Sequence, residues 1–117
     1  MGIPRANRLR HDRDFERVRL TGRTWVNRWL VLSALTNDLG RVRVGVSASR
    51  RVGGAVQRVR ARRLIREAVR PRLGEIADGW DLLFIARSAL SSASFQEVDG
   101  AVAQLLSRAQ VLAEQDR

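Results

Sequence analysis

The segment from Arg41 to Ser49, with the sequence RVRVGVSAS, alternates apolar and polar residues more cleanly than the rest of the chain. Successive side chains of a β-strand point to opposite faces of a sheet, so this alternation predicts a strand with one apolar and one polar face. The apolar face holds three valines and Ala48, and the opposite face holds arginine, glycine and serine. Such a strand fits a sheet that is covered by helices on one side and open on the other.

Two further strands are predicted. Residues 25–36 (WVNRWLVLSALT) are rich in residues that favour β-structure. The turn sequence NDLG follows at 37–40, so the strands on either side of it are expected to form a hairpin. The more apolar segment 81–88 (DLLFIARS) is expected to be a central strand.

Three helices complete the expected order α-β-β-α-β-α. The first covers residues 11–22, with Asp12 as its N-cap and Gly22 at its end. The second runs from Ala55 to about Val69, and the third occupies 94–112, where Ser94 and Glu97 form a capping box. This order predicts an α/β (α+β) two-layer sandwich, in which the helices pack on one face of a small mixed sheet.

The helix at 55–69 carries most of the arginines of the segment RRVGGAVQRVRARRLIREAVRPR, residues 50–72, whose only acidic residue is Glu67. At about 100° per residue, a narrow stripe of alanine, leucine and isoleucine faces the core. Five arginines fall on one other face, with Val59 in their midst and outside the core stripe, and Arg60 lies beside the stripe. The five are Arg58, Arg62, Arg63, Arg66 and Arg70. Like charges spaced four residues apart repel and destabilise a helix, so this face indicates an external polyanion rather than a solvated surface.

The charge distribution supports nucleic-acid binding. The net charge is +10, and all 22 basic residues are arginines, whose guanidinium groups can bind phosphate through two parallel hydrogen bonds. Residues 1–72 hold 19 arginines and 5 acidic residues, whereas residues 73–117 hold 3 and 7. A basic half joined to a core-forming half is typical of nucleic-acid-binding proteins.

Other functions lack a signal. The 117 residues suit one domain, 1–117, and contain neither an apolar run of membrane-spanning length nor a signal-peptide core. The absence of cysteine fits a reducing cytoplasm. No phosphate-binding loop, paired-carboxylate motif or metal-ligand spacing is present, so neither a catalytic nor a metal-binding residue is predicted.

The ordered set of segments resembles a known family. SASRRVGGAVQRVRARRLIREAVR, together with RLRHDRDFERVRLTGR before it and DLLFIAR and SFQEV after it, is similar to the bacterial ribonuclease P protein component. The resemblance implies the protein subunit of a ribonucleoprotein that removes the 5′ leader of precursor tRNA. In that family the RNA is the catalyst and uses Mg²⁺, and the fold contains a left-handed β-α-β crossover. It further implies one monomeric protein per RNA in the cytoplasm, with no membrane partner.

The resemblance also suggests the residues at two sites. Residues that match the family's RNA-binding basic positions are Arg50, Arg51, Arg58, Arg60, Arg62, Arg63, Arg66 and Arg70. Positions at the cleft for the single-stranded leader are Phe15, Arg19, Ser33, Arg43 and Ser47. As an apolar residue of a helix, Phe15 could equally be an ordinary core residue.

Four positions depart from the family pattern. Val59 and Gly54 stand where members usually have asparagine, and Arg19 and Ser33 stand where aromatic residues are common. Stacking of a base on an aromatic ring contributes roughly 1–3 kcal/mol, so leader binding is expected to depend more on arginine here. A ribosomal or RNA-assembly protein would share these electrostatics, and a self-sufficient nuclease is a third possibility.

Overall fold

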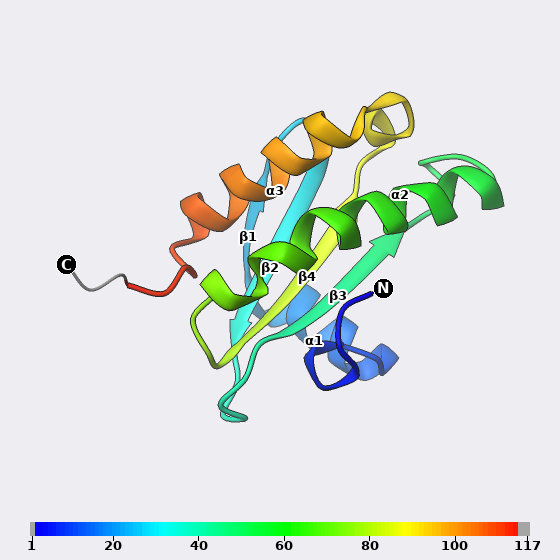
Figure 1. Cartoon of the computed structure of the whole chain (residues 1–117). Helices are drawn as coiled ribbons and strands as arrows, with labels where there is room; N and C mark the ends of the chain where they lie inside the picture. The colour runs from blue at the N-terminus through cyan, green and yellow to red at the C-terminus, as the bar shows by residue number, and fades with distance from the viewer. Residues whose placement is uncertain (1, 115–117) are drawn as a thin grey trace.

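The computed structural model describes residues 2–114, so the predicted domain limits at residues 1 and 117 lie outside the described residues. A single four-stranded sheet forms the centre of the fold (Figure 1). Its strands are β1 (Arg23–Val26), β2 (Leu30–Thr36), β3 (Arg43–Ala48) and β4 (Trp80–Ala86), in the spatial order β1-β2-β4-β3. β4 pairs antiparallel with β2 and parallel with β3, so the predicted mixed sheet with a central final strand is confirmed.

The predicted single strand over residues 25–36 is wrong, because it is interrupted at Asn27. The side-chain Oδ1 of Asn27 accepts hydrogen bonds from the backbone N–H groups of Trp29 and Leu30, at 3.1 and 3.0 Å. This local side-chain turn reverses the chain. The hairpin therefore joins β1 to β2, with Trp25 opposite Leu32.

The predicted hairpin across residues 37–40 is also wrong, because β4 lies between β2 and β3. Leu82, Leu83 and Phe84 are all almost completely buried, so β4 needs cover on both faces and a partner strand along both edges. In the sheet, β4 lies between β2 and β3 and so has a partner strand on both edges. β3 then connects to β4 through a helix as a parallel β-α-β unit, and the left-handed crossover stays a prediction.

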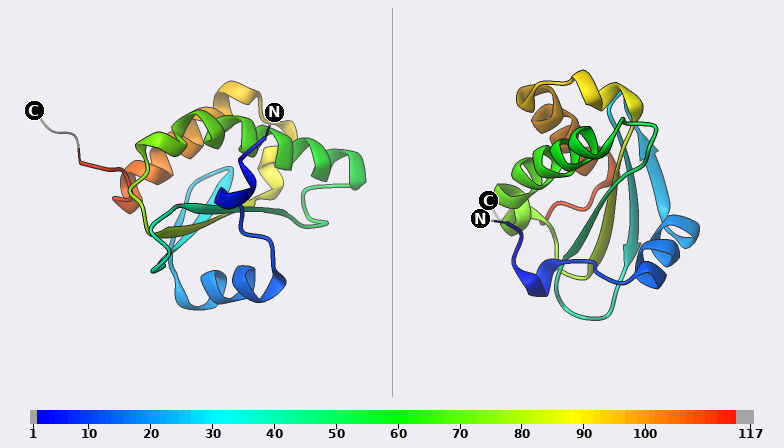
Figure 2. Two further views of the ribbon diagram at one scale, coloured as in Figure 1. Left: turned by 60° about the horizontal axis from the view of Figure 1, so that its bottom comes forward. Right: turned by 90° about the vertical axis from the view of Figure 1, so that its right-hand side faces the viewer.

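Two long helices, α2 (Ala55–Val69) and α3 (Phe95–Ala109), cover one face of the sheet (Figure 2). The predicted stripe of α2 is confirmed: Ala61, Leu64, Ile65 and Ala68 are between 0 and 6% exposed. They join the main core with the valines of β3 and with Leu82 and Phe84 of β4. The capping box of α3 is present, because the Ser94 hydroxyl accepts from the Glu97 N–H and the Glu97 carboxylate accepts from the Ser94 N–H.

The first helix, α1 (Asp12–Thr21), packs on the opposite face, so the expectation that all helices share one face is wrong (Figure 2). The reason lies in β4, where Leu83 and Ile85 present apolar side chains to that second face. Val18, Leu9 and Leu83 form a small separate core there, against which Phe15 packs.

The ends of three elements differ from the predictions. His11 and not Asp12 is the N-cap of α1, without a side-chain capping bond. The last strand ends at Ala86, and residues Ser88–Ser92 form the 3₁₀ helix η3. Helix α3 ends at Ala109 because Gln110 adopts a left-handed conformation, with φ 57° and ψ 41°.

Two further 3₁₀ helices, η1 (Arg5–Asn7) and η2 (Arg70–Glu75), precede α1 and follow α2. No helix within residues 2–114 combines the length and apolar character needed to cross a membrane.

Candidate RNA-binding surfaces

The arginine face of α2 is directed away from the core, as predicted. Arg63 and Arg66 are exposed, and Arg58 and Arg62 are half-buried. The one acidic residue of the helix, Glu67, lies 3.9 Å from Arg63 in an ion pair in which both side chains are at least half exposed. An exposed pair of this kind contributes little stability, so the face remains strongly cationic.

Arg66 has two cationic neighbours, Arg62 on the same helix and Arg8 of the N-terminal segment. Burial, with added repulsion from Arg62 and Arg8, lowers the pKa of the Arg66 guanidinium. Within residues 2–114, neither Arg62 nor Arg66 forms a hydrogen bond or ion pair through its side chain. A cation that is only partly desolvated but is repelled by neighbouring cations, and that has no acidic partner, is stabilised by an external anion.

The other predicted arginines have different surroundings. Arg60 donates through its two terminal nitrogens to the carbonyls of Ser91 and Ala93, at 3.5 and 2.9 Å, and so ties α2 to the η3 segment. Arg50 and Arg51 are exposed in the turn after β3, and Arg70 is exposed where α2 passes into η2. Arg58 has a buried Nε that lacks a hydrogen-bond partner among the described residues.

Val59 lies on the arginine face, as the helical wheel predicts, and 55% of it is exposed. Val56, one turn earlier, is 79% exposed. Together with Ala55 and the side chains of Arg60 and Arg63, they line a shallow apolar hollow of about 400 Å³. The side chain at position 59 is therefore available to a bound molecule, but it offers no hydrogen bond.

A pocket of about 310 Å³ lies between α1 and the sheet, at the predicted leader cleft. Three of the five predicted cleft residues, Phe15, Arg19 and Ser47, line it. The sequence did not reveal the other lining residues, namely Asp12, Glu16, Leu83 and Ile85. Phe15 is half-buried: it packs against the small core and also lines the pocket, so a contact with the leader stays a prediction.

Gly45 of β3 has no side chain and therefore leaves room for the Phe15 ring to pack against the sheet. A Cβ atom at Gly45 would lie 2.9 Å from the ring Cζ and 3.1 Å from the Leu9 Cβ, closer than the ordinary contact distance. The glycine thus allows the ring to rest directly on the strand.

Gly45→Ala is therefore expected to displace Phe15 and to destabilise the protein by about 1–3 kcal/mol through overpacking. Denaturant unfolding measures the stability, and binding of RNA with and without a 5′ leader measures the loss at the pocket. Gly100→Ala is the matched control: it has open space within α3 and should stabilise by about 0.5–1 kcal/mol. Unchanged stability and leader binding in Gly45→Ala would contradict this role of the glycine.

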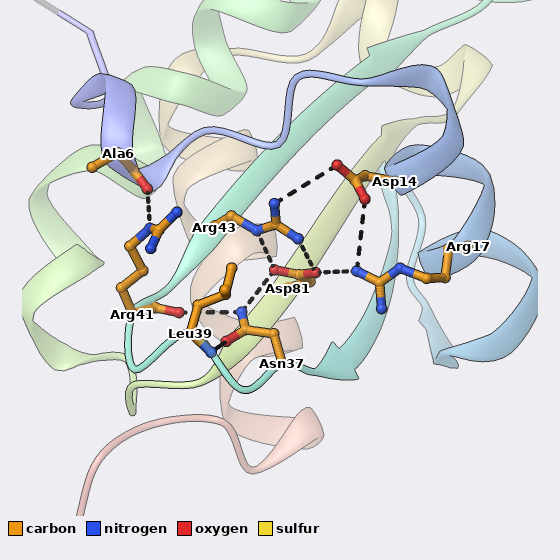
Figure 3. A network of polar contacts seen from close by, with 8 residues as sticks. All are labelled: Ala6, Asp14, Arg17, Asn37, Leu39, Arg41, Arg43 and Asp81. Atoms are coloured by element: carbon orange, nitrogen blue, oxygen red, sulfur yellow. Dashed lines mark hydrogen bonds and ion pairs between the residues drawn. The ribbon is translucent and has the colours of Figure 1, made fainter.

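The remaining two predicted cleft residues do not line this pocket. Ser33 is only 2% exposed, and its hydroxyl lies 3.2 Å from that of Thr24 across the β1–β2 pair. Arg43 is engaged by Asp81, its direct neighbour on β4 (Figure 3). Nε and one terminal nitrogen of Arg43 donate to the two carboxylate oxygens at 2.9 and 2.7 Å.

Asp81 is fully buried and is the centre of a hydrogen-bond network (Figure 3). The network links β4 to β3, to α1 and to the loop after β2. Besides Arg43, Asp81 accepts hydrogen bonds from Arg17 of α1 at 2.6 Å and from the Asn37 side chain at 2.8 Å. Burial alone would raise the pKa of Asp81, but these donors together lower it. Asp14 of α1 adds a longer ion pair with Arg43, at 3.7 Å.

The sequence did not indicate Asp81 as important, because only the β3–β4 pairing places it beside Arg43. An acidic residue at the start of an otherwise apolar strand was the one available signal. The network fixes α1 to the sheet beside the pocket, so Arg43 supports α1 and does not line this pocket.

Comparison with known proteins agrees with this architecture. The family model described as "Ribonuclease P" matches residues 3–110. A ribonuclease P protein component from Roseiflexus castenholzii is 47% identical over 94% of this chain and 91% of its own length. One from Herpetosiphon aurantiacus is 42% identical over 93% and 89%.

Solved structures show the same fold. The ribonuclease P protein of Staphylococcus aureus matches with a TM-score of 0.85 and 27% identity, covering 93% of this chain and 100% of that one. The ribonuclease P protein of Thermotoga maritima matches with a TM-score of 0.78 and 31% identity, over 86% and 96%. The chain belongs to the bacterial ribonuclease P protein component family.

Proposed function

We propose that this protein is the protein subunit of ribonuclease P, the ribonucleoprotein that removes the 5′ leader of precursor tRNA. The observation that carries the proposal is the cationic face of α2, where Arg62 and Arg66 form no ion pair within residues 2–114. Membership of the ribonuclease P family supports RNA as the polyanion. In this proposal it is the RNA subunit of the enzyme together with the substrate. The protein contributes binding and orientation, and the RNA carries out the cleavage.

The two surfaces have separate roles in this proposal. The RNA subunit binds along α2 and the turn before it, through phosphate contacts of Arg50, Arg51, Arg58, Arg62, Arg63, Arg66 and Arg70. Arg60 supports that surface by holding α2 to the η3 segment. The single-stranded leader occupies the pocket between α1 and the sheet, where a base can stack on Phe15 and a phosphate can meet Arg19.

We assign the Mg²⁺ ions of the reaction to the RNA subunit. Among residues 2–114 there is no cluster of three or more histidine or acidic side chains that could hold a metal ion. A bound Mg²⁺ supplies charge stabilisation at the reacting phosphate. We also propose that residues 1–117 act as one domain, with one protein monomer per RNA in the bacterial cytoplasm.

Reconstitution tests this function. Purified protein added to the catalytic RNA at low Mg²⁺ is expected to restore cleavage of precursor tRNA at the leader junction, because the cationic protein offsets the repulsion between the two RNAs. Protein without RNA is the control and should give no cleavage. Absence of stimulation would refute the role in ribonuclease P, and protection of ribosomal RNA in footprints would favour an assembly protein.

A further inference from the structure

A second concentration of arginines lies outside both surfaces described above, on the N-terminal segment. This segment is bound to the exposed edge of β3: the Leu9 N–H donates to the Val44 carbonyl at 2.9 Å, and the Asn7 side chain donates to the Val42 carbonyl at 2.8 Å. Arg8 and Val44 form a parallel bridge. The backbone of this segment therefore holds a defined position along the edge of the sheet (Figure 2).

These arginines surround a hollow of about 420 Å³, which we call the N-terminal basin. Its lining residues are Arg5, Ala6, Arg8, Arg10, His11, Arg41 and Arg43. No carboxylate is among them, and the charge of Arg43 is already compensated by Asp81. Four arginines thus face one hollow without an acidic neighbour in its lining.

Two of the four are held in a way that leaves their terminal nitrogens available. Arg41 donates through Nε to the Ala6 carbonyl at 2.8 Å (Figure 3), and Arg8 donates through Nε to the Ile3 carbonyl at 2.6 Å. Within residues 2–114, the terminal nitrogens of both make no hydrogen bond, and the side chains of Arg5 and Arg10 make none at all. A guanidinium anchored at Nε presents its other two nitrogens in a fixed plane, the geometry that a phosphate accepts.

The basin is continuous with the arginine face of α2. Arg8 lines both the basin and an adjoining pocket of about 380 Å³, whose wall on the α2 side is Arg66. One strand of a polyanion can therefore follow the surface from α2 across Arg8 to Arg5 and Arg10.

We propose that the N-terminal basin binds a second stretch of RNA phosphodiester backbone, continuous with the one on α2. This proposal rests on the proposed function and adds a surface to it. A membrane surface fits less well, because Ala6 is the only apolar residue in the lining and no amphipathic helix is present there to enter a bilayer. Because the contacts are to phosphates, the basin is expected to contribute to affinity and salt dependence rather than to base specificity.

The double variant Arg5→Gln with Arg10→Gln tests the proposal, since neither side chain supports the fold. Binding to the catalytic ribonuclease P RNA is measured over a range of salt concentrations, and the slope of log affinity against log salt is expected to fall by about 1.4–1.8. The matched control is Arg23→Gln with Arg28→Gln, which removes the same charge near the opposite edge of the sheet, where the two arginines lie over Trp25 and Trp29. Its slope should remain close to that of the original protein, and Arg5→Lys with Arg10→Lys should retain the slope.

Measurements with precursor tRNA and with lipid vesicles identify which phosphates bind in the basin. They also distinguish a failure of this proposal from a failure of the proposed function. If the slope falls only for precursor tRNA that carries a leader, the basin binds the leader; if it falls for the catalytic RNA alone, it binds that RNA. Equal slopes for the double variant and the original protein, with both RNAs, would overturn the proposal while leaving the proposed function intact. Loss of binding to phosphatidylglycerol vesicles without any change of RNA slope would overturn it in favour of a membrane surface. Failure of the unaltered protein to bind either RNA would instead refute the proposed function.

Discussion

Replacing Asp81 by alanine is expected to destabilise the protein by about 3–5 kcal/mol, because it leaves a largely buried cation without its hydrogen-bonding partner and with only the longer ion pair to Asp14. The side chain of Arg43 is only 16% exposed, and both of its hydrogen bonds to Asp81 would be lost. Arg17 and Asn37 would lose their acceptor at the same time. Denaturant unfolding monitored by tryptophan fluorescence and circular dichroism measures this change.

Glu67→Ala is the appropriate control for this effect. It also removes one carboxylate that faces an arginine, but the Arg63–Glu67 pair is exposed and should contribute at most about 0.5 kcal/mol. Removing both buried partners, Asp81→Leu with Arg43→Met, should cost less than Asp81→Ala alone, since no unpaired charge remains. Equal losses for Asp81→Ala and Glu67→Ala would show that the network does not support α1.

The same carboxylate gives stability a dependence on acid. The pKa of Asp81 in the folded protein is below its ordinary value of 3.8, so the unfolded chain binds a proton more readily. The stabilisation is therefore complete above that ordinary value and is lost as the pH falls through the folded pKa. Asp81→Asn should show a smaller loss of stability below about pH 4 than the original protein does. The loss of stability in acid that remains in this variant is expected to come from Asp99, whose pKa is lowered by its hydrogen bond from Arg72.

Replacing Arg62 and Arg66 together by glutamine is expected to weaken binding of the catalytic RNA by about 3 kcal/mol, roughly a hundredfold. Each guanidinium lies on the cationic face of α2 without an acidic partner within residues 2–114, so a phosphate contact is lost with each. The slope of log affinity against log salt should fall by about 1.4–1.8. The folded protein should be slightly more stable, since the repulsion between these neighbours is relieved.

Leu64→Ala separates RNA binding from folding in this experiment. Leu64 lies on the core side of the same helix and is 6% exposed, so its truncation should cost about 2–5 kcal/mol of stability. The fraction that remains folded should keep the salt slope of the original protein. If the arginine variant kept both affinity and slope, α2 would not be the RNA surface.

The sequence predicted α2 in detail because all of its determinants are local. The helical period separates Ala61, Leu64, Ile65 and Ala68 from the arginines, and the structure buries the first group and not the second. The same reasoning predicted that Val59 is exposed. The capping box of Ser94 and Glu97 needed only a spacing of three residues, and it is present.

The strand pairing could not be predicted in this way. Residues 25–36 and 41–49 are adjacent in the sequence, and the NDLG turn favours a hairpin, yet pairing on both edges of β4 outweighs that local preference. An Asn27 side chain that bonds to two nearby amides interrupts the first segment, and alternation alone does not reveal this turn.

What the sequence by itself determined is the presence of the three α-helices, the core stripe of α2 and the cationic character of its outer face, because charge and periodicity are properties of neighbouring residues. Only the tertiary structure decided which side chains remain available to a ligand. Pairing of β3 with β4 places Arg43 beside Asp81 and removes it from the pocket between α1 and the sheet, and pairing of β1 with β2 buries Ser33. The N-terminal segment, held against the edge of β3, brings Arg5, Arg8 and Arg10 together with Arg41. These placements depend on contacts between residues far apart in the chain, which no local pattern specifies.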